Sequence, residues 1–381
     1  MAVVVLMSFE AQQKDTDGFA TLGAAAYSST QHRTGGWSMR CNASSGAAAN
    51  FGDIVGLNVT AHWIHFGLFV VTRPSVSRGI WGQTGSGYGL DLNSTGTLSV
   101  HDGATIIGTS AVLSLNTWYW IGVRPQMTGT SVVWLQIDGV DSITATRTVV
   151  GSASSSFGIN GSEASAAEVY IDDFIADDAG FLQPSNVDFA LPISDNTVTG
   201  VTDNNGVTTN IWQCVSNVPP AGVASANEAA NPKKGMHFTA SVTDNYIANL
   251  ETYTTLGIVS GDTVLAVRGV VRHGEDIATG TKNLQNVAAL TNPTVAGSSV
   301  TAGGDAGAHG VEAGLWASTL GTVSTSPSVT LGTSPTIQTS RISESRLACV
   351  DFMGMVVAWT PTTVVATQIP YFNPMPPFLA Q

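Results

Sequence analysis

The chain has 381 residues, of which 43% are hydrophobic and only 11% charged, and its 14 basic and 27 acidic residues give a net charge of −13. At roughly 100–200 residues per domain, this length predicts two domains, or three. An acidic chain without a basic block is a poor match for a nucleic-acid backbone, and no apolar run approaches the roughly 18 residues of a membrane helix.

Short apolar runs recur between turn signals, which is typical of an all-β sandwich. The runs that predict strands in the first half are AVVVLMSF (2–9), AHWIHFGLFVVT (61–72), GYGLDLN (87–93), TLSVHD (97–102), TWYWIGVRP (117–125), SVVWLQID (131–138) and EVYIDDFIA (168–176). The Asp-Gly pairs in HDG (101–103) and IDG (137–139) predict hairpins. The first run lacks the basic start and cleavage pattern of a signal peptide, so we expect no secretory leader.

The sequence becomes turn-rich after residue 180, and strand-like runs then resume. These later runs are GMHFTASV (235–242), DTVLAVRGVVRHG (262–274) and RLACVDFMGMVVAWT (346–360). We therefore expect a second β-sandwich-like domain with long loops over residues 183–362. Residues 363–381 contain four prolines and no clear period, which predicts an extended C-terminal arm. Such an arm lies on a neighbouring subunit or remains a loose terminus, and the sequence is compatible with both.

Five motifs in chain order resemble the concanavalin A-like, or laminin-G-like, jelly rolls. They are SFE (8–10), DGF (17–19), NTWYWIGVR (116–124), VVWLQIDGV (132–140) and EVYIDDFIADDAG (168–180). The resemblance covers residues 1–182 and implies a jelly-roll sandwich whose last strand carries the first pair of aspartates. Some domains of this kind bind calcium, so the resemblance also leaves a metal site open.

The second half resembles bacteriophage virion proteins. The segments that carry the resemblance are ALPISDNTVTGVTDNNGVTTNIWQCVSNVPP (190–220), the run from Asn245 to Ala288, and DFMGMVVAWTP (351–361). The resemblance implies a non-enzymatic structural protein of the virion, assembled in the host cytoplasm as a tail-associated or outer-surface (decoration) component. Its implied partners are other copies of itself and other virion proteins, through the loops and the C-terminal arm.

The acidic cluster EVYIDDFIADDAGFL (168–182) is the first candidate site. A carboxylate pair suggests calcium, which takes six to eight oxygen ligands from several loops. Asp172 and Asp173 are adjacent, however, so on a regular strand they point to opposite faces and serve one ion only if the strand bulges. We therefore interpret them as structural acids that meet backbone amides or a turn, with Asp177, Asp178 and Gly180 marking the turn out of the strand. Calcium remains the alternative, and no other cofactor is expected.

Histidines and cysteines give weaker signals. His62 and His65 are three positions apart on one predicted strand, so they do not share a face. His273 lies with Glu275 and Asp276 at the end of a predicted strand, and no nucleophile motif accompanies this trio. Its place favours a solvated loop tip over a hydrolase site. The three cysteines (Cys41, Cys214 and Cys349) are far apart and odd in number, which predicts neither a disulfide framework nor a zinc site.

Aromatic residues in Gly-rich segments are the candidates for ligand contact. Trp37 lies in TGGWS, and Trp81 and Tyr88 lie in RGIWGQTGSGYG. A ring exposed beside polar groups can stack on a sugar, and jelly rolls often use edge loops for binding. The alternative function is therefore a carbohydrate-binding module for attachment to host-surface glycans, with Trp37, Trp81 and Tyr88 as contacts. The competing interpretation is that these rings plug the ends of the sandwich.

Overall fold

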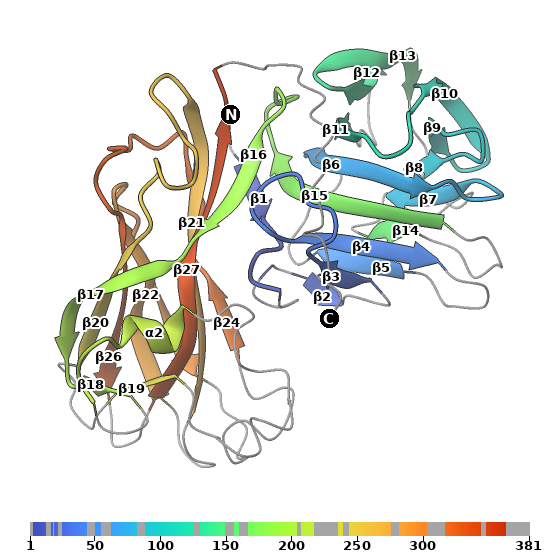
Figure 1. Cartoon of the computed structure of the whole chain (residues 1–381). Coiled ribbons are helices and arrows are strands. Elements are labelled where there is room, and N and C mark those ends of the chain that lie inside the picture. Colours follow the sequence, from blue (N-terminus) through green and yellow to red (C-terminus); the bar gives the residue numbers. More distant parts are fainter. Residues whose placement is uncertain are drawn as a thin grey trace, which may run out of the picture.

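The computed structural model describes residues 3–12, 17, 19–21, 25–43, 50–54, 62–81, 88–124, 130–148, 156–159, 167–203, 207–216, 235–238, 244–275, 282–302, 317–343 and 348–362. Within these ranges the regular structure is almost entirely β, in four antiparallel sheets that form two sandwiches side by side (Figure 1). The predicted all-β, jelly-roll-like class is confirmed. The predicted arm at 363–381 lies outside the described residues.

Two sheets enclose the core of the first sandwich, and Trp81, Phe66, Leu90 and Trp134 are among its fully buried residues. The eight-stranded sheet has the order β13 (Val140–Thr148), β12 (Thr130–Ile137), β11 (Trp118–Val123), β6 (Trp63–Thr72), β15 (Ala167–Asp177), β4 (Ser38–Ala43) and β3 (Ala26–Ser28), and β1 (Val3–Met7) also pairs with β15. The seven-stranded sheet has the order β10 (Thr105–Val112), β9 (Thr97–Asp102), β8 (Tyr88–Leu92), β7 (Arg78–Trp81), β14 (Ser156–Ile159), β5 (Asn50–Ile54) and β2 (Phe19–Thr21).

The hairpin predicted at IDG connects β12 and β13. Ile137 pairs with Val140, so the loop consists of two residues, Asp138 and Gly139. Both have positive φ, 52° and 77°. This is the conformation that the twist of a two-residue hairpin favours, and it explains the Asp-Gly sequence. The second predicted hairpin, at HDG, joins β9 to β10, with Asp102 paired to Thr105.

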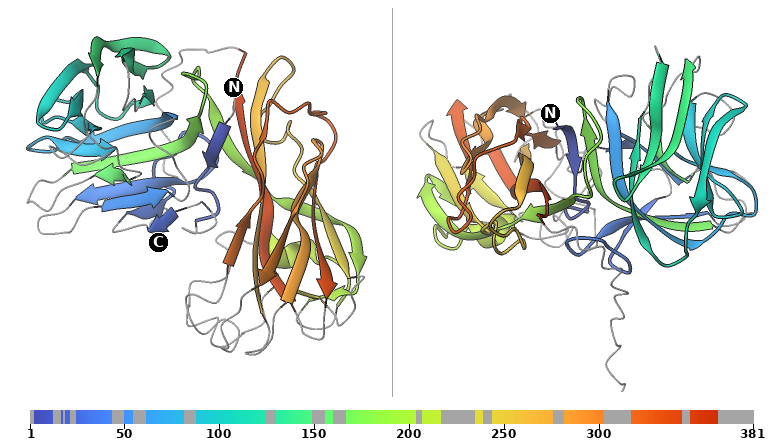
Figure 2. Two further views of the ribbon diagram at one scale, coloured as in Figure 1. Left: turned by 180° about the vertical axis from the view of Figure 1, so that it is seen from behind. Right: turned by 90° about the horizontal axis from the view of Figure 1, so that it is seen from above.

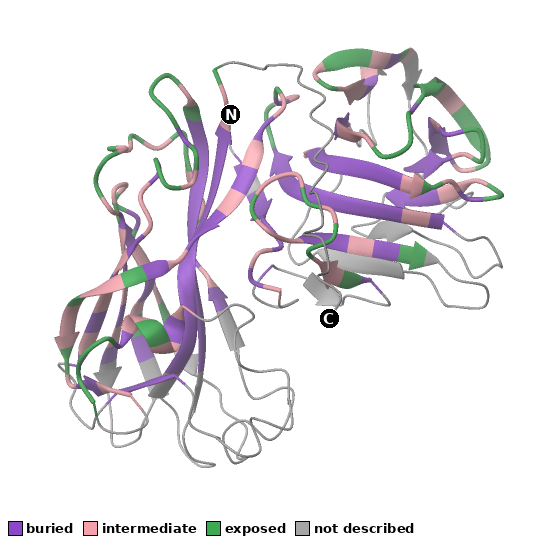
Figure 3. Ribbon diagram, in the orientation of Figure 1, coloured by how far each residue is buried: buried purple, intermediate pink, exposed green. Residues whose placement is uncertain are grey.

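The second sandwich is built in the same way. Its seven-stranded sheet has the order β18 (Val201–Thr202), β19 (Met236–Phe238), β27 (Ala348–Thr360), β21 (Thr263–Glu275) and β24 (Ala317–Leu320), with β16 (Asn186–Ala190) paired to β27 and β25 (Ser324–Thr325) paired to β21. Its five-stranded sheet has the order β17 (Pro192–Thr199), β20 (Asn245–Leu250), β26 (Thr336–Ser343), β22 (Lys282–Thr291) and β23 (Ser298–Ala302). A short helix, α2 (Trp212–Val215), lies against this sandwich. The long strands β21 and β27 are neighbours inside the seven-stranded sheet and are mostly buried (Figure 3).

A third apolar cluster joins the two sandwiches at the face where they meet (Figure 2). It combines Leu6, Trp120 and Ile175 from the first sandwich with Phe352 and Val356 from the second. The buried Arg268 of β21 adds a polar contact, because its Nη2 donates to the Leu6 carbonyl at 2.6 Å. The junction therefore has its own core, which favours a fixed arrangement of the two sandwiches. Among the described residues, no helix is long and apolar enough to span a membrane.

Candidate functional site

Strand β15 changes partners halfway along one edge. Residues Ala167–Ile171 pair with β4, and Phe174–Asp177 pair with β1. On the opposite edge, the ladder to β6 shifts register between Asp172 and Ile175. Asp173 has φ 52°, so the strand bulges here, and bulges of this kind redirect side chains. Asp172 and Asp173 thus lie in the gap between the β4 and β1 ladders.

The bulge lets both aspartates contact the segment at Arg33 and Thr34, which corrects the prediction that they point to opposite faces. Asp172 Oδ2 accepts the amides of Arg33 at 2.6 Å and Thr34 at 3.3 Å. Asp173 Oδ2 accepts Arg33 Nη1 at 2.6 Å, and Asp173 Oδ1 accepts the Thr34 hydroxyl and the Val187 amide, the latter at 2.7 Å. Val187 lies on β16, a strand of the second sandwich that begins at Asn186. The bond from its amide to Asp173 therefore ties the first sandwich to the second.

Arg33 completes the network, and we call its contacts the Arg33 clamp. Its Nη1 also donates to the Ser185 carbonyl at 2.6 Å, and its guanidinium lies 5.0 Å from the centre of the Trp120 ring. Burial raises the pKa of Asp172, with the Asp173 charge as the second cause. Burial also raises the pKa of Asp173, although Arg33 opposes this rise. Two carboxyls are therefore buried beside one cation, and their hydrogen bonds offset much of the cost of burial.

The same bonds argue against calcium at this pair. All four carboxylate oxygens already accept hydrogen bonds, since Asp172 Oδ1 takes the Asp173 amide at 2.9 Å. Over the described ranges, no group of three or more His, Cys, Asp and Glu residues is placed to hold a metal ion. Both acids accept bonds from backbone amides, as the structural interpretation expects. Asp177 Oδ1 likewise accepts the Ala179 and Gly180 amides, at 2.8 and 3.0 Å, and so forms the expected turn.

The histidines have structural surroundings. His65 is fully buried, its Nε2 accepts the Leu182 amide at 3.0 Å, and burial lowers its pKa to about 3. His62 lies just before β6 and is partly exposed. His273 is buried in β21 with its Nε2 2.8 Å from the Thr319 hydroxyl, and burial lowers its pKa to about 4. The expectation of a solvated loop tip is therefore wrong for His273, while the Glu275 side chain and Asp276 lie outside the described part of the chain.

The three aromatic candidates have different environments. Trp81 ends β7 with its side chain fully buried in the first core, so its predicted glycan contact is wrong. Strand β7 is an inner strand of its sheet, paired with both β8 and β14. From there the Trp81 ring packs into the core of the first sandwich. The backbone of Tyr88 begins β8, and its side chain lies outside what the structure describes. Trp37 remains partly exposed, next to the junction of the two sandwiches.

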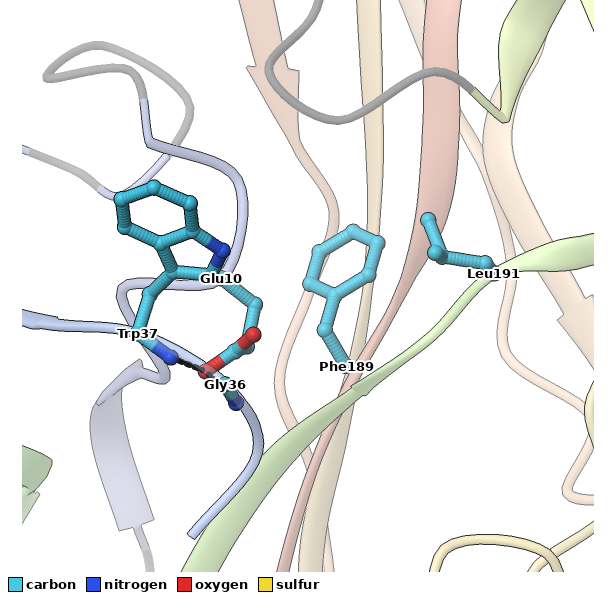
Figure 4. A pocket seen from close by; sticks show the side chains of 5 residues that line it. All are labelled: Glu10, Gly36, Trp37, Phe189 and Leu191. Atoms are coloured by element: carbon cyan, nitrogen blue, oxygen red, sulfur yellow. Dashed lines mark hydrogen bonds between the residues drawn. The ribbon is translucent and has the colours of Figure 1, made fainter. Parts of the chain in front are cut away.

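Trp37 lines a pocket of about 220 Å³, which we call the junction pocket (Figure 4). Glu10, Gly36 and Trp37 form the wall from the first sandwich, and Phe189 and Leu191 form the wall from the second. Glu10 follows β1 closely, and its Oε1 accepts the amides of Gly36 at 3.0 Å and Trp37 at 2.9 Å. This carboxyl therefore fixes the loop that carries the indole.

Two carboxyl groups at the pocket hold their protons to a higher pH than usual. The Glu10 pKa is raised to about 8, first by burial and then by the Asp188 charge. Burial similarly raises the Asp188 pKa to about 7. A Cβ placed on Gly35 would clash with Glu10 Oε1 and lie 2.9 Å from Asp188 Oδ1, so both carboxyls closely flank the backbone of this glycine. Its positive φ of 57° also favours glycine.

Sequence reasoning identified Trp37 but missed the groups around it. In the sequence, Glu10 belongs to the SFE motif, and Phe189 lies in the predicted second domain with no signal of its own. They meet Trp37 because β1 pairs with the end of β15 while β16 crosses to β27. The GG pair before Trp37 was the available signal, since glycine permits a close approach by another group.

No family model matches the sequence, and no curated protein matches it. Among solved structures, a sialidase of Trypanosoma rangeli in complex with 2,3-difluoro-KDN is similar at 10% identity and a TM-score of 0.31, over 42% of this chain and 27% of the sialidase. The cellulose induced protein Cip1 is similar at 10% identity and a TM-score of 0.34, over 46% of this chain and 97% of Cip1. The CBM22-1–CBM22-2 tandem domain of Paenibacillus barcinonensis Xyn10C is similar at 10% identity and a TM-score of 0.23, over 93% of this chain and 97% of that one. Likeness at this level does not bear on the chemistry of the chain.

Proposed function

We propose that the protein is a non-enzymatic structural component of a bacteriophage particle, present in repeated copies. The observation that carries this proposal is the junction, where an apolar cluster and the Arg33 clamp join two sandwiches into one body. A rigid body of this kind holds its surface loops at fixed spacing, which repeated assembly requires. The resemblance of the second half of the sequence to bacteriophage virion proteins is the reason for placing this body on a phage particle.

In this proposal the contacts between subunits come from loops and from residues 363–381. The protein occupies a tail-associated or outer-surface position, and its partners are further copies and other virion proteins. Mass spectrometry of particles purified on a density gradient tests it, together with sedimentation velocity of the isolated protein. The expected result is several copies in each particle and self-association in solution. A chain that is absent from particles and strictly monomeric would contradict the proposal.

Carbohydrate attachment to a host surface is a second candidate, and it is compatible with the first. The partly exposed indole of Trp37 beside the Glu10 carboxyl is the observation that favours it. An aromatic face with a nearby hydrogen-bonding group suits a sugar ring, which has an apolar face and hydroxyl edges. A glycan array tests it with the wild type, Trp37→Ala and Trp118→Ala. Trp118 is also a partly exposed tryptophan, but it packs on Phe69, with the ring centres 5.2 Å apart, so its loss is a matched control.

We assign no catalytic role to the junction pocket. Glycoside hydrolysis needs two carboxyl groups on either side of the bond that breaks, about 5–10 Å apart. Glu10 is the carboxyl that lines the pocket among the described residues, while Asp188 does not line it and its Oδ1 accepts the Phe189 amide at 2.7 Å. Incubation with bacterial surface polysaccharide and a reducing-end assay tests this assignment. New reducing ends above the level of a Glu10→Gln variant would contradict it.

A further inference from the structure

The junction pocket is a slot between two apolar walls. The Trp37 indole forms one wall, and Phe189 and Leu191 lie across from it on the other sandwich (Figure 4). Its volume of about 220 Å³ lies below the roughly 300–1,000 Å³ of pockets that enclose drug-sized ligands. The slot therefore has room for one flat group of a larger ligand, and the rest of that ligand stays in solvent.

Glu10 supplies the polar side chain of the slot. Both of its side-chain bonds to described residues use Oε1, which accepts the amides of Gly36 and Trp37. On the opposite wall the backbone of Leu191 is already paired, because its amide donates to Glu251 Oε2 and its carbonyl accepts the Glu251 amide, both at 3.0 Å. Glu10 Oε2 is therefore the side-chain oxygen that the described lining leaves for a ligand.

The Glu10 carboxyl is mostly protonated at pH 7. Burial first, and then the Asp188 charge, raise its pKa to about 8, although its two backbone hydrogen bonds oppose this rise. The other charged groups on the elements around it are Asp17, Asp172, Asp173, Arg33, Arg268 and Glu251. A protonated carboxyl has one O–H donor. Because Oε1 accepts two amide protons, the carboxyl proton lies on Oε2, and this atom donates to a ligand.

We infer that the junction pocket binds an N-acetylated amino sugar, whose acetamido group enters the slot and accepts a hydrogen bond from Glu10 Oε2. This inference rests on the second candidate function and names the chemical class of its ligand. An acetamido group is flat, so it fits between the Trp37 indole and Phe189, and its methyl group gains apolar contact there. Its carbonyl oxygen is the acceptor that a protonated Glu10 needs. An ammonium group has no acceptor, and a hydroxyl group lacks the methyl.

An NMR titration at pH 6 tests this inference with the methyl glycosides of N-acetylglucosamine, glucosamine and glucose. These probes keep one ring and vary one substituent, and nearly all Glu10 is protonated at this pH. We expect N-acetylglucosamine to bind about tenfold more tightly than the other two, which is the gain from one hydrogen bond and one buried methyl group. Trp37→Ala should lose this binding. Trp118→Ala, the control for a tryptophan outside the pocket, should keep it.

The pH dependence of binding isolates the role of Glu10. At about pH 9.5 the wild-type carboxyl has lost its proton, so Oε2 and the sugar carbonyl are both acceptors, and the affinity should fall about tenfold. Glu10→Gln keeps a donor, because its amide nitrogen replaces Oε2 while its amide oxygen accepts the two backbone bonds. This variant should match the wild type at pH 6 and retain that affinity at pH 9.5. Circular dichroism at each pH checks that every variant is folded.

The outcomes separate this inference from the function on which it rests. Glucose or glucosamine that binds as tightly as N-acetylglucosamine overturns the inference, and so does sugar binding that ignores Trp37→Ala. An equal loss of affinity at high pH in the wild type and in Glu10→Gln also overturns it, because another group then causes the loss. Each of these results leaves carbohydrate attachment standing. If neither a glycan array nor the three probes give any binding, both the inference and carbohydrate attachment fail.

Discussion

Replacing Arg33 by methionine should weaken the junction much more than an equivalent change at a surface ion pair. The Arg33 side chain is 18% exposed and that of Asp173 is 0% exposed. The substitution removes two charge-assisted bonds, to Asp173 Oδ2 and to the Ser185 carbonyl, each worth about 1.5–3 kcal/mol. Protonation of Asp173, whose pKa is already raised, recovers part of this loss. We expect a net cost of about 3 kcal/mol, at the lower end of values for broken buried pairs.

Arg40→Met is the matched control. Arg40 on β4 donates its Nε to Glu168, which lies on β15 as Asp173 does, at 2.8 Å. Here, however, the two side chains are 40% and 22% exposed. Exposed pairs contribute about 0–1 kcal/mol, so this change should cost less than about 1 kcal/mol. Urea unfolding followed by tryptophan fluorescence measures both, as the free energy of the first transition. If the two variants lie within about 0.5 kcal/mol of each other, the clamp does not stabilise the junction as described.

Three further predictions concern the core, pH and calcium. Because Trp81 is fully buried, Trp81→Ala should lower the free energy of unfolding by about 3–5 kcal/mol. Trp37→Ala should lower it by less than half as much. Equal losses of stability in thermal melts of the two variants would contradict this. Between the ordinary pKa of Glu10, 4.5, and its raised value of about 8, the folded protein binds more protons than the unfolded chain, so the free energy of unfolding should fall as pH rises. The fall should be less steep in Glu10→Gln. Urea midpoints at pH 5 and pH 8 measure both proteins, and an identical pH dependence would refute the prediction. Millimolar calcium should leave the melting temperature unchanged, since every oxygen of Asp172 and Asp173 is hydrogen-bonded, and a rise of several degrees that EDTA reverses would restore the calcium site.

Local signals in the sequence were sufficient for several of the buried strands and for two hairpins. Apolar runs bounded by turn residues predicted β6, β11, β15, β21 and β27, and the structure contains each of them. The Asp138–Gly139 pair predicted a two-residue hairpin because its positive φ values are a property of those residue types. Such signals need no knowledge of the rest of the chain.

Long-range pairing produced the features that the sequence did not reveal. Regular alternation put Asp172 and Asp173 on opposite faces, and the bulge that brings both to Arg33 arises where β15 exchanges β4 for β1. Trp81 was expected in a loop because glycines flank it, but pairing with β8 and β14 extends the strand and buries the ring. The junction pocket depends on the contact between two sandwiches, which local periodicity does not encode.

Cryo-electron microscopy of purified particles is the most direct test of the proposed structural role. The account predicts repeated density into which the two sandwiches fit as one body, with the relative orientation fixed at Arg33, Asp173 and Val187. It also predicts that neighbouring copies touch through loops and the C-terminal residues. Particles that lack this density, or that hold the two sandwiches in several relative orientations, would contradict the account.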